Sequence, residues 1–153
     1  MNGFYFLVIS ILPIAISQCP STGRLGPDNH CYAAYNSTGP GMPLDWTNAA
    51  RYCRKLNGDL ASIHDGFVNS FLWDWSKDPT VGDIWIGLYC STSQTNDTYA
   101  WIDKSAYDYK NWVQLQTNCD KFGNACAYMQ SQDGKWTTYL MCTFDAKSFI
   151  CKF

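Results

Sequence analysis

Residues 84–89 read Ile-Trp-Ile-Gly-Leu-Tyr, a short apolar run in which β-branched and aromatic residues predominate. A run of this length and composition is typical of a buried strand. Working outward, four further stretches predict strands at residues 99–102, 125–130, 136–142 and 148–153. Gln132-Asp133-Gly134 is expected to form the hairpin turn between the second and third of these. Residues 104–124 have no periodicity and predict a long irregular loop, which in a compact domain is usually functional or tied by disulfides.

Two helices are expected before these strands. Asp45 is a suitable N-cap for the first, and Gly58 is expected to close it in the left-handed conformation. The second begins near Asp65 and ends before Pro79 and Gly82. Apolar residues recur at helical spacing at Trp46, Ala49, Ala50, Cys53 and Leu56, and again at Val68, Phe71, Leu72 and Trp75. Helices followed by strands predict a mixed α+β domain.

Composition narrows the class of protein. The chain has 153 residues, 46% hydrophobic, with a net charge of −2, which fits one domain with a core of its own and excludes overall disorder. No dense basic cluster occurs, so no nucleic-acid partner is expected. All thirteen acidic residues are aspartates, and the chain contains no glutamate.

The N-terminus predicts export. Residues 4–16 are almost wholly apolar and uncharged, yet too short to span a bilayer comfortably. Ala15 and Ser17 supply the small residues of a cleavage site, so residues 1–17 are interpreted as a signal peptide and 18–153 as the mature domain. An uncleaved anchor is the alternative. No other stretch reaches spanning length, which predicts a secreted, extracellular protein, and Asn36 and Asn96 begin N-glycosylation sequons.

Eight cysteines survive that cleavage: Cys19, Cys31, Cys53, Cys90, Cys119, Cys126, Cys142 and Cys151. An even count in an oxidising compartment predicts a disulfide framework. No Cys-x-x-Cys pair occurs, which argues against a zinc ribbon or a redox motif. Spacing alone cannot choose among the roughly 105 possible pairings.

Motifs along the whole chain resemble the C-type lectin-like domain. They are Cys-Pro and Cys-Tyr at Cys19 and Cys31, Gly-Asp-Leu-Ala-Ser-Ile-His at 58–64, Trp-Ile-Gly-Leu at 85–88, Trp-Ile-Asp at 101–103, Asn-Trp at 111–112, and Cys126, Met129, Gly134, Trp136, Cys142 and Cys151. The resemblance implies an α+β fold with two helices packed on short antiparallel sheets and a long loop, stapled by disulfides. It implies the pairs Cys19–Cys31, Cys53–Cys151 and Cys126–Cys142, and the two extra cysteines, Cys90 and Cys119, are predicted to tether the loop.

The resemblance also locates a ligand site and puts its usual metal in doubt. Sugar-binding members of the family hold Ca²⁺ with a Glu-Pro-Asn or Gln-Pro-Asp triplet, a glutamate, and an Asn-Asp pair after a tryptophan. The corresponding residues here are Gln116-Thr117-Asn118, Asn124, and Thr137-Thr138. None carries a carboxylate, whereas Ca²⁺ prefers several. We therefore expect no calcium at the usual site and no other cofactor.

Other loop residues remain candidates for ligand binding. Asn118, Asp120 and Asn124 could form an oxygen-rich cluster, with Asp133 as a further carboxylate, although solvated loop side chains are the simpler interpretation. Tyr107 and Tyr109 are expected to be exposed and able to stack on a sugar or anchor a protein. Trp112 and Phe122 are the loop's other aromatic residues, and Trp112 is expected to lie in the core.

Nothing in the sequence forms a catalytic motif. His64 adjoins Asp65, which is already explained as a cap, and Ser62 lies in a turn rather than in a nucleophile elbow. We therefore expect a non-enzymatic recognition module that binds a glycan or a cell-surface glycoprotein, as the resemblance implies. The alternative is a calcium-independent protein-binding module, and a secreted hydrolase is a remote third.

Overall fold

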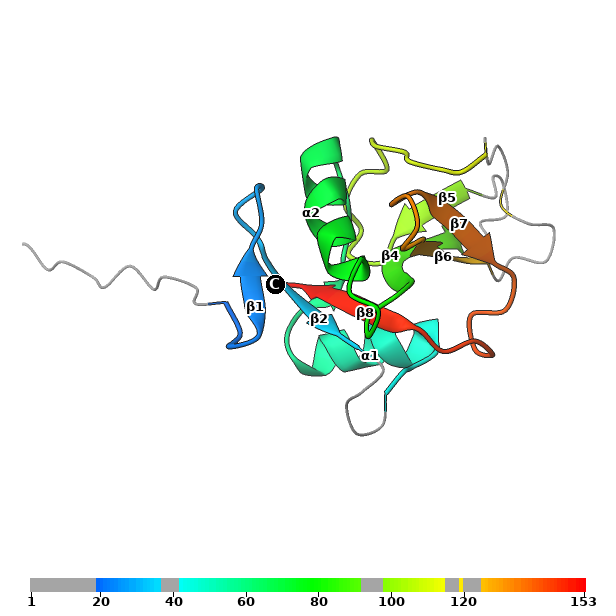
Figure 1. Cartoon of the computed structure of the whole chain (residues 1–153). Helices are drawn as coiled ribbons and strands as arrows, with labels where there is room; N and C mark the ends of the chain where they lie inside the picture. The colour runs from blue at the N-terminus through cyan, green and yellow to red at the C-terminus, as the bar shows by residue number, and fades with distance from the viewer. Residues whose placement is uncertain (1–18, 37–41, 92–97, 115–118, 120–124) are drawn as a thin grey trace, which may run out of the picture.

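The computed structural model describes residues 19–36, 42–91, 98–114, 119 and 125–153. In these ranges helices α1 (Trp46–Lys55) and α2 (Gly66–Ser76) pack with a single mixed sheet (Figure 1). The strands are β1 (Gly23–Leu25), β2 (Cys31–Tyr35), β3 (Asp59–Leu60), β4 (Ile84–Ser91), β5 (Thr98–Trp101), β6 (Cys126–Met129), β7 (Trp136–Tyr139) and β8 (Ser148–Lys152). No helix in the described ranges is long and apolar enough to cross a membrane.

The sheet confirms the predicted α+β class, but the pairing of its strands differs from the prediction. Its main path runs β1-β2-β8-β4-β6-β7, with β3 paired to β8 and β5 paired to β4. We expected short antiparallel sheets, whereas β4 and β8 pair in parallel and join the two halves into one sheet. β1 and β2 form the N-terminal hairpin that the resemblance implies.

Both helices begin where the sequence predicts. The carboxylate of Asp45 accepts a hydrogen bond from the backbone N–H of Asn48 at 2.9 Å, and that of Asp65 accepts one from Val68 at 2.8 Å. The second helix ends at Ser76, before Pro79 and Gly82 as expected.

The end of α1 differs from the prediction. The left-handed residue is Asn57 (φ 63°), not Gly58. Asparagine tolerates this conformation better than most residues. Gly58 is needed for a different reason, because a Cβ there would lie 2.5 Å from the carbonyl oxygen of Lys152.

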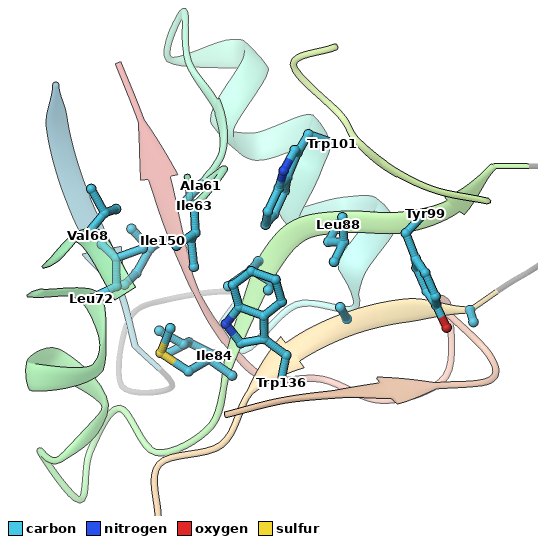
Figure 2. Packing of buried hydrophobic residues seen from close by; sticks show 14 of the residues in the cluster. Ala61, Ile63, Val68, Leu72, Ile84, Leu88, Tyr99, Trp101, Trp136 and Ile150 are labelled. Carbon is cyan, nitrogen blue, oxygen red and sulfur yellow. The ribbon is translucent and has the colours of Figure 1, made fainter. Parts of the chain in front are cut away.

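β4 is buried on both faces and divides the core in two. Ile84, Ile86 and Leu88 belong to one cluster with α2, whereas Trp85 belongs to another with α1. This alternation follows the two-residue period of a strand. In Figure 2, Trp101 and Trp136 converge on the first cluster beside β4, with their rings edge to face and centroids 5.6 Å apart. The expectation of a buried strand at 84–89 is therefore confirmed, although Tyr89 is partly exposed.

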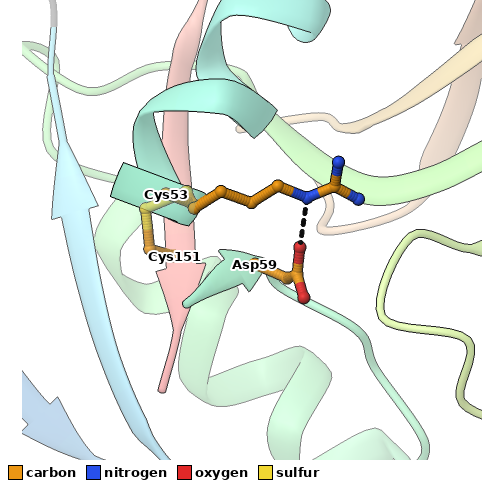
Figure 3. The surroundings of a disulfide bond; sticks show 4 residues. Cys53, Asp59 and Cys151 are labelled. Atoms are coloured by element: carbon orange, nitrogen blue, oxygen red, sulfur yellow. Dashed lines mark hydrogen bonds and ion pairs between the residues drawn. A yellow bond between two sulfur atoms is a disulfide. The ribbon is translucent and has the colours of Figure 1, made fainter. Parts of the chain in front are cut away.

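Four disulfides staple these elements, in the pairs that were predicted. Cys53–Cys151 ties α1 to β8 (Figure 3), beside an ion pair between Arg54 Nε and Asp59 Oδ1 at 3.1 Å. The other pairs are Cys19–Cys31, Cys90–Cys119 and Cys126–Cys142. No cysteine among the described residues is free.

Candidate functional site

Aromatic rings form a floor beneath the start of the long loop. Trp112 packs edge to face on Trp136 with ring centroids 5.7 Å apart, and the ring of Tyr99 is tilted against that of Trp112 with centroids 4.8 Å apart. Tyr109 contacts Trp136 at 5.6 Å. The indole N–H of Trp112 donates to the hydroxyl of Tyr107 at 2.7 Å. These contacts place Trp112 against the core, as expected.

The same contacts correct the prediction for Tyr107 and Tyr109. Both are only partly exposed and pack against the core cluster rather than standing free in the loop. Burial raises the pKa of both phenols. Their rings therefore pack on the aromatic floor and leave only part of their surface open to a ligand. Residues 104–124 showed no periodicity, so no pattern in the sequence indicated this burial.

β7 is held from both sides where it begins. The backbone N–H of Trp136 donates to Asn111 at 2.7 Å, and its carbonyl accepts from Val113 at 2.9 Å. The indole N–H of Trp136 donates to the side chain of Asn69 at 2.8 Å, and Asn69 in turn donates to the carbonyl of Gly134 at 3.1 Å. Buried polar groups paired in this way fix the strand in position.

The two predicted threonine ligands lie on β7 but not on one face of it. β7 pairs with β6 in continuous register, so successive side chains alternate between the faces of the sheet. Thr138 lies on the side of Trp136 and the aromatic floor, and Thr137 lies on the side of Tyr139. Only Thr138 is thus placed to act together with the loop. Both side chains are partly exposed.

The remaining predicted ligands cannot be compared with the structure. Gln116, Thr117, Asn118, Asp120 and Asn124, together with Phe122 and Asn96, lie outside the described residues. Cys119 is described, and its disulfide to Cys90 attaches the loop to β4. Asn36 is partly exposed just after β2, in keeping with the sequon that it begins.

No metal centre is evident in the part of the chain that the structure describes. No three His, Cys, Asp or Glu side chains converge there. Asp133 is exposed and accepts a hydrogen bond from the backbone of Lys135 at 3.0 Å, which gives it a role in the turn before β7. At the usual calcium position β7 offers hydroxyl groups rather than carboxylates, and these donors do not fit a calcium cage.

A polar groove of about 590 Å³ contains both histidines of the chain, but its groups are engaged with one another. The buried Ser62 hydroxyl donates to Asp103 at 2.5 Å and accepts from Lys152 at 3.1 Å. His64 pairs with Asp108 at 2.8 Å, and this hydrogen bond lowers the pKa of the Asp108 carboxyl. Ser62 is thus held in a buried network and is not presented as a nucleophile.

A second groove, of about 490 Å³, was not predicted. It lies between the start of α1 and the segment after β7, with Trp46, Tyr89 and Met141 among its lining residues. The strand expected at 136–142 ends at Tyr139, and the chain then carries Leu140, Met141 and Phe144 outward, 54%, 56% and 79% exposed. The uncharged run over 137–144 was the available signal, but it was interpreted as strand.

The family follows from one comparison. The model of the family described as the lectin C-type domain matches residues 42–153, which is most of the described fold. This chain belongs to the C-type lectin domain family. The match includes β4, the aromatic floor, β7 and the cysteines of Cys53–Cys151 and Cys126–Cys142.

Individual relatives and structures agree. The chain is 28% identical to C-type lectin BfL-2 of Bungarus fasciatus over 151 residues, which cover 89% of each protein. It is also 28% identical to a C-type lectin mannose-binding isoform of Oxyuranus scutellatus, again with 89% of each covered. Among solved structures, a calcium-independent type II antifreeze protein aligns with a TM-score of 0.69 and 26% identity, covering 89% of this chain and 94% of that one.

Proposed function

We propose that this C-type lectin domain is a secreted, non-catalytic recognition module that binds glycans without calcium. The binding surface would be Thr138 together with the neighbouring segment 107–114, which we call the β7 face. The observation that carries the proposal is the fixed position of β7, where a hydroxyl side chain replaces a carboxylate beside a rigid aromatic floor. Bound glycans could belong to a cell-surface glycoprotein.

The chemistry of the β7 face suits a neutral polyol. Thr138 offers a hydroxyl that can donate and accept, and sugar hydroxyls need both. The floor beneath is held by the contacts of Trp112 and Trp136, so little conformational entropy would be lost on binding. The Oxyuranus relative is named as mannose-binding, and the type II antifreeze protein is described as calcium-independent. Sugar binding and calcium independence, which we combine here, are thus each ascribed to a protein of similar sequence.

The absence of calcium rests on the sequence at the usual ligand positions. All of them carry amides or hydroxyls, so a divalent ion would have only neutral oxygens and water as ligands. Rebuilding the cage would need Asp120 and at least one more carboxylate from the loop. We therefore expect the fold to be equally stable with and without calcium.

A calcium-independent protein-binding role is the second candidate. One observation favours it, namely the apolar side chains of Leu140, Met141 and Phe144, which are exposed beside a groove. Exposed apolar patches beside a groove are a mark of protein interaction sites. This surface lies after β7 and is distinct from the β7 face.

The first test is thermal melting of the disulfide-intact domain in millimolar Ca²⁺ and in EDTA, followed by a glycan array in both buffers. We expect equal melting temperatures and the same bound glycans. A ligand present at about 100 times its Kd would stabilise the domain by about 2.7 kcal/mol, so a true calcium site would be obvious. A shift of several degrees would contradict calcium independence, and an array without binders would contradict the glycan proposal.

Two substitutions on one strand locate the site. Thr138→Ala should weaken binding of any array-positive glycan roughly tenfold, because one hydrogen bond to a sugar hydroxyl is lost. Thr137→Ala is the matched control, since it removes the same hydroxyl from the opposite face of β7, and it should leave affinity unchanged. Equal effects of the two variants would mean that the glycan does not bind at the β7 face.

A further inference from the structure

Apolar side chains gather on one exposed segment, between β7 and β8. Leu140, Met141 and Phe144 are more than half exposed, and Tyr139 at the end of β7 is 37% exposed. Leu140, Met141 and Phe144 line the 490 Å³ groove, whose other walls include Trp46 and Tyr89. We call these four side chains and the groove the Phe144 surface. In Figure 1 the segment (orange) leads from the end of β7 toward the start of α1.

The segment is held in this exposed position rather than free to fold back. Cys142 is bonded to Cys126, and its carbonyl accepts from the backbone of Trp46 at 3.0 Å. At the other end, the ammonium group of Lys147 lies 4.4 Å from the ring centre of Tyr128 and 5.3 Å from that of Trp85. Cation–π contacts of this kind become stronger where water is excluded. Both ends of the segment are therefore held, and Phe144 between them lies at the rim of the groove with 79% of its surface exposed.

The chemistry of the Phe144 surface indicates what could cover it. No described residue that lines the groove carries a charge. The two carboxylates adjacent to lining residues in sequence are engaged elsewhere, since Asp145 is paired with Lys147 and Asp45 caps α1. A charged partner would find nothing to recognise, whereas two identical copies would meet without repulsion. The surface also combines a projecting side chain with a receiving groove. A two-fold axis needs such self-complementarity within one patch, because each copy then offers both parts to the other.

The available area fits a weak pair. With exposures of 37–79%, these four side chains present on the order of 500 Å² of mostly apolar surface per copy. Two copies would bury about 1,000 Å², which is at the low end for specific interfaces and corresponds to a reversible complex rather than an obligate one.

We propose that two copies of this chain associate through the Phe144 surface as a weak two-fold dimer, with Phe144 of each copy seated in the groove of the other. The β7 face remains open in each copy, so the dimer would present two recognition sites. A bivalent arrangement binds repeated ligands more tightly than a single site does. The dimer does not depend on what the β7 face binds.

Sedimentation velocity on the secreted, disulfide-intact chain tests the proposal without any glycan. We expect a monomer–dimer equilibrium with a Kd in the range of about 10–100 μM. Phe144→Ser should raise that Kd at least roughly tenfold, because a central aromatic anchor dominates a small interface. Phe67→Ser is the matched control, since Phe67 on α2 is 80% exposed compared with 79% for Phe144. It should leave the Kd unchanged.

Three outcomes would overturn the proposal. They are a monomer at every concentration up to several hundred micromolar, an equal loss of dimer in both variants, or growth beyond the dimer, which a closed two-fold interface does not allow. Both variants should have the melting temperature of the parent chain, because neither side chain is buried. Glycan binding by a strictly monomeric chain would contradict the dimer and leave the proposed function intact.

Discussion

At the scale of single residues, the glycine of the Trp-Ile-Gly-Leu motif has a steric role. A Cβ at Gly87 would overlap the carbonyl oxygen of Leu60 and approach Ile102 Cγ2 to 3.1 Å. We expect Gly87→Ala to lower the free energy of unfolding by about 2–3 kcal/mol, since the contact is with backbone that cannot easily move. Chemical denaturation of the disulfide-intact domain would measure it. Gly66→Ala, where a Cβ would lie 3.7 Å from the hydroxyl of Tyr109, is the control and should be neutral or slightly stabilising.

Asn69 is a second residue whose role is specific. Its side chain connects the indole of Trp136 to the carbonyl of Gly134, and it is 6% exposed. Asn69→Ala would leave a buried N–H without a partner, which should cost about 2–3 kcal/mol of stability. Unfolding with urea measures this, and near-ultraviolet circular dichroism would report the altered surroundings of Trp136. An unchanged urea midpoint would show that Asn69 does not fix β7.

Residue roles were only partly predictable from sequence. The caps Asp45 and Asp65 followed from local chemistry, because an N-cap needs only a side-chain acceptor at the right place. Asn57 was missed in favour of Gly58, since the choice between them depends on the approach of Lys152 from another element. The burial of Tyr109 depends on Trp136, a partner distant in sequence, which no local pattern encodes.

At the scale of elements, Asp28 joins the β1–β2 hairpin to β8. Burial of its carboxyl opposes ionisation, but hydrogen bonds from Tyr32 and from the backbone of His30, together with the charge of Lys152, lower its pKa overall. A depressed folded-state pKa means that the ionised form stabilises the fold above the unfolded value of about 4. That stability is lost as the pH falls through the folded-state pKa.

Replacement of Asp28 should therefore make the free energy of unfolding less dependent on pH in the acid range. We expect Asp28→Asn to cost about 1–2 kcal/mol at pH 7, and the difference from the parent chain to shrink as the pH falls from 4 toward 2. Urea midpoints across this range would show it. Asp74→Asn, at an exposed position on α2, is the control. If the difference in stability between Asp28→Asn and the parent chain did not change with pH, the carboxylate charge would not be what stabilises the hairpin.

The limits of individual elements show what periodicity can and cannot predict. The buried run at 84–89 was predictable because a short, continuous apolar run rich in β-branched and aromatic residues favours a buried strand. The strand at 136–142 was extended too far, because Leu140 and Met141 continue the apolar pattern although they are exposed. The strand ends where the chain must turn to place Cys142 against Cys126, and that constraint is tertiary.

At the scale of the whole molecule, motif resemblance predicted the disulfides and the fold family, while the residues alone predicted only the α+β class. The parallel pairing of β4 with β8 could not be predicted, because it depends on the path of the chain between elements far apart in sequence. The resemblance placed Thr137 and Thr138 in one site, whereas the alternation of side chains along β7 assigns them to opposite faces. The Phe144 surface was missed because exposure is a property of the assembled fold.

The disulfides differ in how well the assembled fold protects them. Cys53 and Cys151 are fully buried between α1 and β8, whereas Cys19 and Cys142 are partly exposed. We expect mild reductant to open Cys19–Cys31 and Cys126–Cys142 in the folded domain, because thiol–disulfide exchange requires access to a sulfur atom. Cys53–Cys151 should open only at the rate of global unfolding. Its loss should then prevent refolding, since it closes the longest loop and contributes about 4–5 kcal/mol in the chain-entropy model.

Timed alkylation followed by peptide mass spectrometry would give the order in which the disulfides open. Subdenaturing urea should accelerate the opening of Cys53–Cys151 far more than that of Cys19–Cys31 and Cys126–Cys142. Early opening of Cys53–Cys151 without urea would show that α1 separates from β8 in the native state, so that the two halves of the core are less firmly joined than their packing implies.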